Sequence, residues 1–443
     1  MSRKIHSILF IVIVALSVIP VQSQELVLDF TAAKELALKN NPKMHLSQAA
    51  LAISKTRISE ARSALLPTID AFSQYQRAWE LPTVIFEDPF SDGVIEFKMG
   101  TEHTLVYGVN LQQPLFAGGA IWSSYQIARH GYNIAQAQLT ATHQNLILNV
   151  ATSYYATLFS RSVVRVMEEA LETAQENLEQ VQKIRAVGQS SDFDVLRAEV
   201  GVANFRPLLI SARNNYRLAR SQLKQVLGID GNPDIKINEK LIYTKNEFSN
   251  INIEDLMIIA LNSRPEMKIL DEQKLISKRQ LVLARSALMP NLIFGTAYQY
   301  QGQKEKFEFG NDDFYKSFNS SISFNFPLFH GLQTRARVQK AKINIRETDL
   351  QEKTLTDGLR LEVESAYYTI QETEQNVQTQ MKIIDQATEA LRLARLLYAE
   401  GAGTQLDVMN AESALNQTKM NYQQSLFEYN IALAKLKKAL NQL

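Results

Sequence analysis

An internal repeat is the feature that most constrains how this chain can fold. The heptapeptide ARSALLP at residues 61–67 recurs as ARSALMP at 284–290, an offset of 223 residues. After the Pro-Leu-Phe motifs at 114–116 and 327–329 the offset becomes 213, and it persists for more than a hundred residues. The chain therefore consists of two copies of one structural unit, and the two to four domains suggested by its 443 residues would be misleading.

The N-terminus has the pattern of an export signal. Arg3 and Lys4 precede an apolar run at 8–19, and a small-residue cleavage site follows at 21–23. An uncleaved anchor is the alternative, but about 12 apolar residues are fewer than the roughly 20 that a spanning helix needs. No later window approaches 18 consecutive apolar residues, so further membrane insertion must use strands. We expect a signal peptide at 1–23, a first repeat at 24–227, a linker at 228–253 and a second repeat at 254–443.

The alternation of apolar and polar residues predicts two strands in each half of the chain. They lie at about 68–78 and 102–113 in the first half, and at about 291–301 and 317–326 in the second. In the last strand Phe318, Ile322 and Phe324 share one face, whereas Asn and Ser residues occupy the other. Such a strand can present one face to lipid and the other to water. A half-buried sheet in a soluble domain has the same pattern. The connections at 79–100 and 302–316 are expected to be loops of unequal length at the end away from the helices.

Long helices are expected after the second strand of each half. Residues 120–186 contain no proline, so a continuous helix there would be about 100 Å long, and residues 332–399 repeat this segment. Both segments end near a glycine, Gly188 or Gly401, after which a shorter helix returns. Apolar and small residues on the returning helices are spaced three and four apart, which is typical of a supercoiled hairpin. These residues are Val195, Ala198, Val202, Phe205, Leu209, Ala212, Tyr216, Ala219 and Leu223 in the first half, and Val408, Ala411, Leu415, Thr418, Tyr422, Ser425, Tyr429, Ala432 and Leu436 in the second.

Four strands per chain cannot close a transmembrane barrel, because even the smaller barrels have about eight. Open sheet edges are not tolerated in lipid. The chain must therefore associate, and three copies related by cyclic symmetry would supply twelve strands. We expect a mixed α/β membrane protein with an internal twofold repeat. Its transmembrane β-barrel, with four strands per chain and twelve per trimer, would continue into a long coiled-coil α-helical barrel.

Residue types that carry catalysis or metal binding are absent or scattered. The chain has no cysteine, its six histidines do not stand at metal-ligand spacing, and it has neither a phosphate-binding loop nor a G-x-S-x-G turn. We therefore expect no enzymatic activity, no metal and no cofactor. With 47 Lys and Arg against 46 Asp and Glu, the net charge of +1 gives no electrostatic footprint for nucleic acid, which we exclude as a partner.

Several features together resemble one known family. They are the signal peptide, the duplicated strand–strand–long-helix unit, the Pro-Leu-Phe-x-Gly motif after each second strand, and the motif Gly401-x-x-Thr404-x-x-Asp407-Val408. In combination they resemble the TolC-like outer membrane efflux proteins, also called outer membrane factors. The resemblance implies a homotrimer in the outer membrane that spans into the periplasm. It also implies an equatorial belt formed by residues 228–262 and both termini.

The same resemblance implies a function. Members of the family are passive exit ducts of tripartite efflux or type I secretion systems, surrounded by outer-membrane lipid and docked to a periplasmic adaptor and an inner-membrane pump. Two other functions stay open: a pump-independent porin-like or adhesive outer-membrane protein, and a structural coiled-coil scaffold in the periplasm. Osmotic shock would release a scaffold, whereas a barrel requires detergent. Because the pump selects the cargo, drugs, metal ions and secreted proteins all stay open as substrates.

The turns between the long and the returning helices hold the candidate functional residues. The resemblance implies that an adaptor docks at the hairpin tips and that the second tip lines the constriction of the duct. The expected docking residues are Gly188, Ser191, Gly401 and Thr404, and the expected gate residues are Asp407, Asn410, Tyr398 and Asp194.

Two roles are open for the aspartates. Thr404 with Asp407, and Ser191 with Asp194, have the spacing of a capping box, in which the carboxylate satisfies free amides at a helix start. The resemblance implies a gating role as well, because threefold symmetry would place three Asp407 carboxylates around the axis as a cation-selective ring. The two roles are compatible.

The gate departs from the family pattern at two positions. Asn410 stands where the namesake of the family has a second aspartate, which halves the charge of the expected ring. Gly403 stands where it has a gate-locking arginine, so this chain lacks the side chain for that lock. Tyr398 and Asp194 match their counterparts, and a hydrogen bond between them would tie neighbouring hairpins together.

Overall fold

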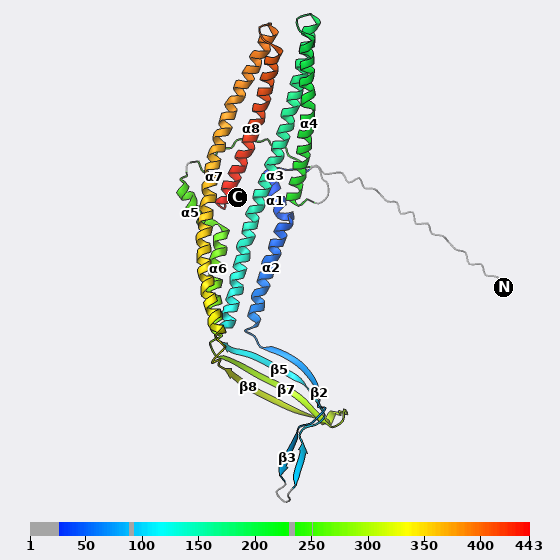
Figure 1. The fold of residues 1–443 in the computed structure, drawn as a ribbon, viewed down its shortest axis with the longest axis vertical. Coiled ribbons are helices and arrows are strands. Elements are labelled where there is room, and N and C mark those ends of the chain that lie inside the picture. The colour runs from blue at the N-terminus through cyan, green and yellow to red at the C-terminus, as the bar shows by residue number, and fades with distance from the viewer. Residues whose placement is uncertain (1–25, 88–92, 230–234, 250) are drawn as a thin grey trace, which may run out of the picture.

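The protein is elongated, with helical hairpins at one end and a sheet at the other (Figure 1). The computed structural model describes residues 26–87, 93–229, 235–249 and 251–443. The expected signal peptide and its cleavage site lie outside the described residues. None of the described helices carries an apolar stretch long enough to cross a membrane.

The helices and long strands begin and end within a few residues of their expected positions. In the first repeat they are α1 (Phe30–Asn40), α2 (Pro42–Ser63), β2 (Thr68–Arg77), β5 (His103–Ala117), α3 (Ala120–Ala186) and α4 (Asp192–Leu227). In the second repeat they are α5 (Ile253–Ser263), α6 (Pro265–Ser286), β7 (Asn291–Lys304), β8 (Phe314–Asn325), α7 (Gln333–Ala399) and α8 (Gln405–Ala439). The two short strands β1 (Leu26–Val27) and β6 (Ile235–Lys236) pair in parallel and join the start of the described chain to the linker.

Local chemistry explains the boundary between α1 and α2. The Asn41 side chain accepts a hydrogen bond from the Lys43 N–H at 2.9 Å, which satisfies one free amide of α2. Pro42 follows at the first helical position, where the N–H that proline lacks has no partner to lose. Pro265 holds the same place at the start of α6. A proline thus opens the second helix of each repeat.

The four long strands form one antiparallel sheet in the order β2-β5-β7-β8. The two repeats meet at its centre, where β5 pairs with β7 and Tyr107 lies opposite Tyr300. Their rings stack with centroids 5.5 Å apart. In the described part of the chain, β2 and β8 each pair with one neighbour in this sheet, so each leaves one edge unpaired. The sheet curves along its length (Figure 1).

The connection at 79–100 differs from the expected loop. Strands β3 (Thr83–Glu87) and β4 (Val94–Lys98) pair in a separate antiparallel ribbon that projects beyond the sheet (Figure 1). The β-branched and aromatic residues here favour strands, but Pro82 favours an irregular connection. Because each strand has only five residues, the alternation was too short to predict. The shorter connection at 302–316 contains one 3-10 turn, Asn311–Asp313.

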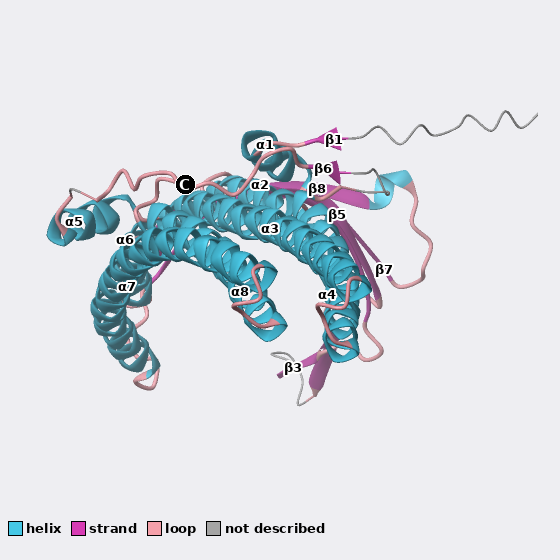
Figure 2. Cartoon of the chain, turned by 90° about the horizontal axis from the view of Figure 1, so that it is seen from above, coloured by secondary structure: helices cyan, strands magenta, loops and turns pink. Residues whose placement is uncertain are grey.

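The helices form a curved layer (Figure 2). Near the sheet, α6 lies between α3 and α7, and α2 lies on the other side of α3; near the tips, α8 and α4 take the corresponding places. On each returning helix, the apolar and small residues spaced three and four apart form a stripe. These stripes are largely buried against α3 and α7, which confirms the helical hairpins. The buried stripe residues are Val195, Ala198, Val202, Leu209, Ala212, Ala219 and Leu223 on α4, and Val408, Leu415, Thr418, Ser425, Tyr429, Ala432 and Leu436 on α8.

The largest hydrophobic core lies at the waist, where the linker contacts the long helices. Tyr154 of α3 and Tyr429 of α8 are fully buried there. The Tyr154 hydroxyl donates to the Glu239 carboxylate at 2.5 Å, and the Tyr429 hydroxyl donates to the Thr244 carbonyl. The linker therefore contacts helices of both repeats and holds them together at mid-height.

A buried guanidinium joins three helices at the same level. Arg264, between α5 and α6, is 4% exposed. It donates to Glu266 at 2.9 Å and to Glu362 of α7 at 3.0 Å, and its longer bonds reach the Lys438 and Ala439 carbonyls at the end of α8. Burial raises the pKa of the Glu362 carboxyl, but Arg264 and Lys438 outweigh that effect and hold the pKa below its ordinary value.

Glu362→Ala should lower the free energy of unfolding by about 2 kcal/mol, because it leaves a buried guanidinium with one carboxylate partner instead of two. Thermal unfolding in detergent, followed by circular dichroism, measures the loss. The control is Glu364→Ala, an exposed position on the same helix. Since the folded-state pKa of Glu362 is lowered, its contribution is present at neutral pH and is lost as the pH falls through that pKa. Equal stability of the two variants at neutral pH would contradict this account.

Candidate functional site at the hairpin tips

Two turns lie at the end of the molecule farthest from the sheet (Figure 1). The turn from α3 to α4 contains Gly188 at φ 76°, and the turn from α7 to α8 contains Gly401 at φ 71°. Glycine adopts this left-handed conformation without strain, which ends each long helix. The Gly188 N–H bonds to the Arg185 carbonyl at 2.8 Å, and the Gly401 N–H bonds to the Tyr398 carbonyl at 3.1 Å. The chain can therefore reverse within a few residues.

A capping box starts each returning helix. The Asp407 N–H donates to the Thr404 hydroxyl oxygen at 3.2 Å, and the Thr404 N–H donates back to the Asp407 carboxylate at 2.9 Å. Ser191 and Asp194 make the same reciprocal bonds at 3.1 and 3.2 Å. The expected capping role of both aspartates is confirmed.

Both aspartates are held in their charged form. The Thr404 hydroxyl and backbone N–H hold the pKa of the Asp407 carboxyl below its ordinary value. The Ser191 hydroxyl does the same for the pKa of Asp194, against a smaller opposing effect of burial. Each carboxylate also lies at a helix N-terminus, where a negative charge is favoured. Both carboxylates at the tips are therefore negatively charged at neutral pH.

Tyr398 and Asp194 come together, but a third residue joins them. The Tyr398 hydroxyl lies 3.3 Å from the Ser190 hydroxyl, which donates to the Asp194 carboxylate at 3.3 Å. Sequence reasoning predicted a direct bond and missed Ser190, because nothing in the pattern distinguishes it from the neighbouring cap Ser191. The contact ties the two hairpins of one chain near their tips.

Asp407 and Asn410 form a second, separate pair. Both are exposed and lie one turn apart on α8. Within the described ranges, no hydrogen bond joins this pair to Tyr398 or Asp194. The four expected gate residues thus divide into a bonded contact between hairpins and an exposed acidic and amide face. The expected docking residues Gly188, Ser191, Gly401 and Thr404 all lie in the turns themselves.

A pocket of about 300 Å³ separates the hairpins just behind the tips. It is lined by Glu176, Asn177, Gln180, Ile184, Arg395, Tyr398, Ala399 and Val408. Beside it, Arg395 pairs at 3.0 Å with Glu412, whose side chain is 6% exposed. Burial raises the pKa of Glu412, and Arg395 partly offsets this. The internal repeat aligns Glu412 with Glu199, which is exposed, so sequence gave no reason to single out this buried pair.

In the part of the chain that the structure describes, no three His, Cys, Asp or Glu residues lie close enough together to hold a metal ion.

Known proteins share this architecture. The family model described as outer membrane efflux protein matches residues 34–229 and 259–442. The chain is 22% identical to outer membrane protein TolC of Escherichia coli over 91% of this chain and 80% of that protein. It is also 22% identical to the cation efflux system protein CusC of Escherichia coli, over 85% and 83% of the two chains.

Solved structures agree in fold. The Campylobacter jejuni CmeC outer membrane channel superposes with a TM-score of 0.78 at 18% identity, covering 93% of this chain and 85% of that one. The open state of the Neisseria gonorrhoeae MtrE outer membrane channel gives 0.76 at 19% identity, covering 93% and 88%. The chain belongs to the outer membrane efflux protein family, whose members are channels of the outer membrane that extend into the periplasm, and not enzymes.

Proposed function

We propose that three copies of this chain form the outer-membrane exit duct of a tripartite efflux or type I secretion system. The observation that carries the proposal is the sheet, whose edge strands β2 and β8 each pair with one neighbour in the described chain. Unpaired backbone groups cost several kcal/mol each in lipid. Pairing β8 of one copy with β2 of the next, in a cyclic trimer, leaves no edge and gives twelve strands.

The proposed duct is passive, and a partner supplies its energy. The sequence contains no phosphate-binding loop with which to hydrolyse a nucleotide. Helices α3 and α7, each 67 residues long, carry the tips about 100 Å from the sheet. A periplasmic adaptor would dock there and connect the duct to an inner-membrane pump. CusC is named as part of a cation efflux system, but in the proposed assembly the pump selects the cargo.

The proposed gate uses both sets of tip residues. If α8 lines the mouth, a trimer places three charged Asp407 carboxylates around the axis, with Asn410 as a neutral ring beside them. The Ser190–Tyr398 bond joins adjacent hairpins and is worth about 1 kcal/mol, and the Ser190–Asp194 bond within the first hairpin holds Ser190 in place. Breaking the Ser190–Tyr398 bond would let the tips separate at a modest cost, as a gate requires.

A photoreactive amino acid at Gln189 or Ala402, both exposed at the tips, should capture the periplasmic adaptor in cells that express adaptor and pump. The control position is Glu60, which is exposed on α2 near the sheet and should capture none. A pump-independent porin-like or adhesive protein has no adaptor to bind at its tips. Absence of the adaptor from both tip adducts would therefore favour that alternative.

Asp407→Asn should lower cation selectivity and weaken block by divalent cations in planar bilayers, because it removes the charge of the ring. Thr404→Ala separates charge from capping. It removes the capping hydroxyl, lowers the free energy of unfolding by about 1 kcal/mol, and keeps the Asp407 carboxylate. Cation selectivity should fall in Asp407→Asn and stay unchanged in Thr404→Ala. If Asp407→Asn changes only thermal stability, the residue is a cap and the gate lies elsewhere.

A further inference from the structure

Positive charge is concentrated on the parts of the helices nearest the sheet. The start of α3 (120–131), the end of α6 (278–286) and the start of α7 (333–346) contain nine Lys and Arg residues and no Asp or Glu. The whole chain is balanced, with 47 cations and 46 carboxylates. We call the nine residues the basic collar: Arg129, Lys278, Arg279, Arg285, Arg335, Arg337, Lys340, Lys342 and Arg346.

The basic collar has no acidic partners of its own. Within the described ranges, none of its nine residues forms a salt bridge. The end of α2 lies beside α3 and adds Lys55, Arg57 and Arg62 with a single carboxylate, Glu60. Uncompensated charge of one sign repels itself, so it favours an anionic neighbour.

The end of the basic collar nearest the sheet lies at the level expected for lipid headgroups. Exposed apolar residues occupy the junction between strands and helices, among them Leu288, Phe326 and Phe329, and Trp122 in the first turn of α3 is half exposed. Aromatic residues of this kind mark the boundary between hydrocarbon and water. Arg337 follows four residues after the start of α7, about 6 Å along the helix. The headgroup layer is about 5 to 8 Å deep on each side of a bilayer.

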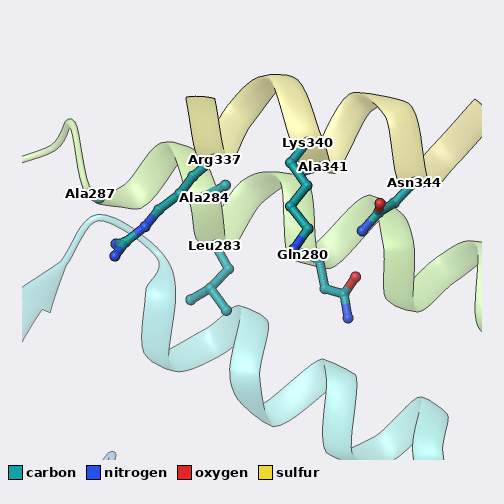
Figure 3. A pocket seen from close by; sticks show the side chains of 8 residues that line it. All are labelled: Gln280, Leu283, Ala284, Ala287, Arg337, Lys340, Ala341 and Asn344. Carbon is teal, nitrogen blue, oxygen red and sulfur yellow. The ribbon is translucent and has the colours of Figure 1, made fainter. Parts of the chain in front are cut away.

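A pocket within the basic collar offers matching chemistry. It has a volume of about 310 Å³ and is lined by Gln280, Leu283, Ala284, Ala287, Arg337, Lys340, Ala341 and Asn344. Lys340 extends from α7 toward α6 near Gln280 and Asn344, and Arg337 extends across the end of α6 in the direction of Ala287 (Figure 3). A guanidinium can bind two phosphate oxygens at once, and an ammonium adds a second charge. The alanines and Leu283 supply an apolar wall.

We propose that this pocket between α6 and α7 binds the phosphate of an anionic phospholipid headgroup in the periplasmic leaflet of the outer membrane. The charge selects an anion, the apolar wall suits the glycerol and the first methylenes of a lipid, and Arg337 lies at the level of the headgroups. The bound lipid would brace α6 against α7 where the sheet meets the helices. The inference rests on the outer-membrane location and is independent of the proposed adaptor and pump.

The test is native mass spectrometry of the full-length protein in detergent, titrated with phosphatidylglycerol and with phosphatidylcholine. The wild type should bind phosphatidylglycerol more tightly. Arg337→Gln with Lys340→Gln should weaken that binding about thirty-fold, given the usual worth of two cations near anionic lipid, and should leave phosphatidylcholine binding unchanged. The control is Arg360→Gln with Lys382→Gln, which removes the same charge from exposed positions farther along α7.

Three results would overturn the proposal. One is unchanged phosphatidylglycerol binding in a folded Arg337→Gln, Lys340→Gln protein. Another is an equal loss in the control pair, which would indicate general charge attraction without a pocket. The third is displacement of phosphatidylglycerol by millimolar inorganic phosphate, which would assign the pocket to a soluble anion reached from water.

Discussion

Backbone hydrogen bonding in lipid is the constraint on which the rest of this structure depends. A strand edge in hydrocarbon leaves N–H and C=O groups without water or protein partners. One repeat supplies two long strands and the duplicated chain supplies four, and the open edges of β2 and β8 show that four do not close. The proposed trimer satisfies this constraint, because β8 of each copy pairs with β2 of the next. It also arranges the helices that continue from the strands as a ring.

Stability is distributed unevenly along the molecule. At the waist, the linker covers a large hydrophobic core, and Arg264 joins α6, α7 and α8 through buried bonds. Near the tips, small hydrophobic clusters and the Ser190 contact hold the hairpins together. Segments with few buried contacts open at lower free energy than the core. A rigid waist with a weakly tied tip is consistent with the proposed gate at the hairpin tips.

The elements that were predicted well from the sequence are those whose ends are marked by local residues such as glycine. The long helices α3 and α7 are bounded by glycines and contain no proline, and their ends were predicted within one residue. The ribbon of β3 and β4 was missed because strands of five residues show too little alternation to distinguish them from a loop. The internal repeat did not indicate the ribbon, because the corresponding connection at 302–316 has no such pair of strands.

Contacts between elements were harder to predict than the elements themselves. Both capping boxes followed from spacing alone, because their partners are three residues apart. The Ser190 bridge and the Arg395–Glu412 pair depend on how two hairpins or two helices are rotated against each other. No local pattern encodes that rotation. The pocket of the basic collar likewise combines residues of α6 and α7 that are more than fifty positions apart.

Disulfide scanning between β2 and β8 tests the central claim most directly, and a chain without native cysteine gives a clean background. One cysteine replaces Phe72 in β2, and a second is moved along β8 from Ser317 to Ser323. The account predicts that some positions yield a covalent trimer on a denaturing gel, because β8 of each copy pairs with β2 of the next around a closed ring. Monomers at every position, or a ladder that stops at dimers, would contradict it.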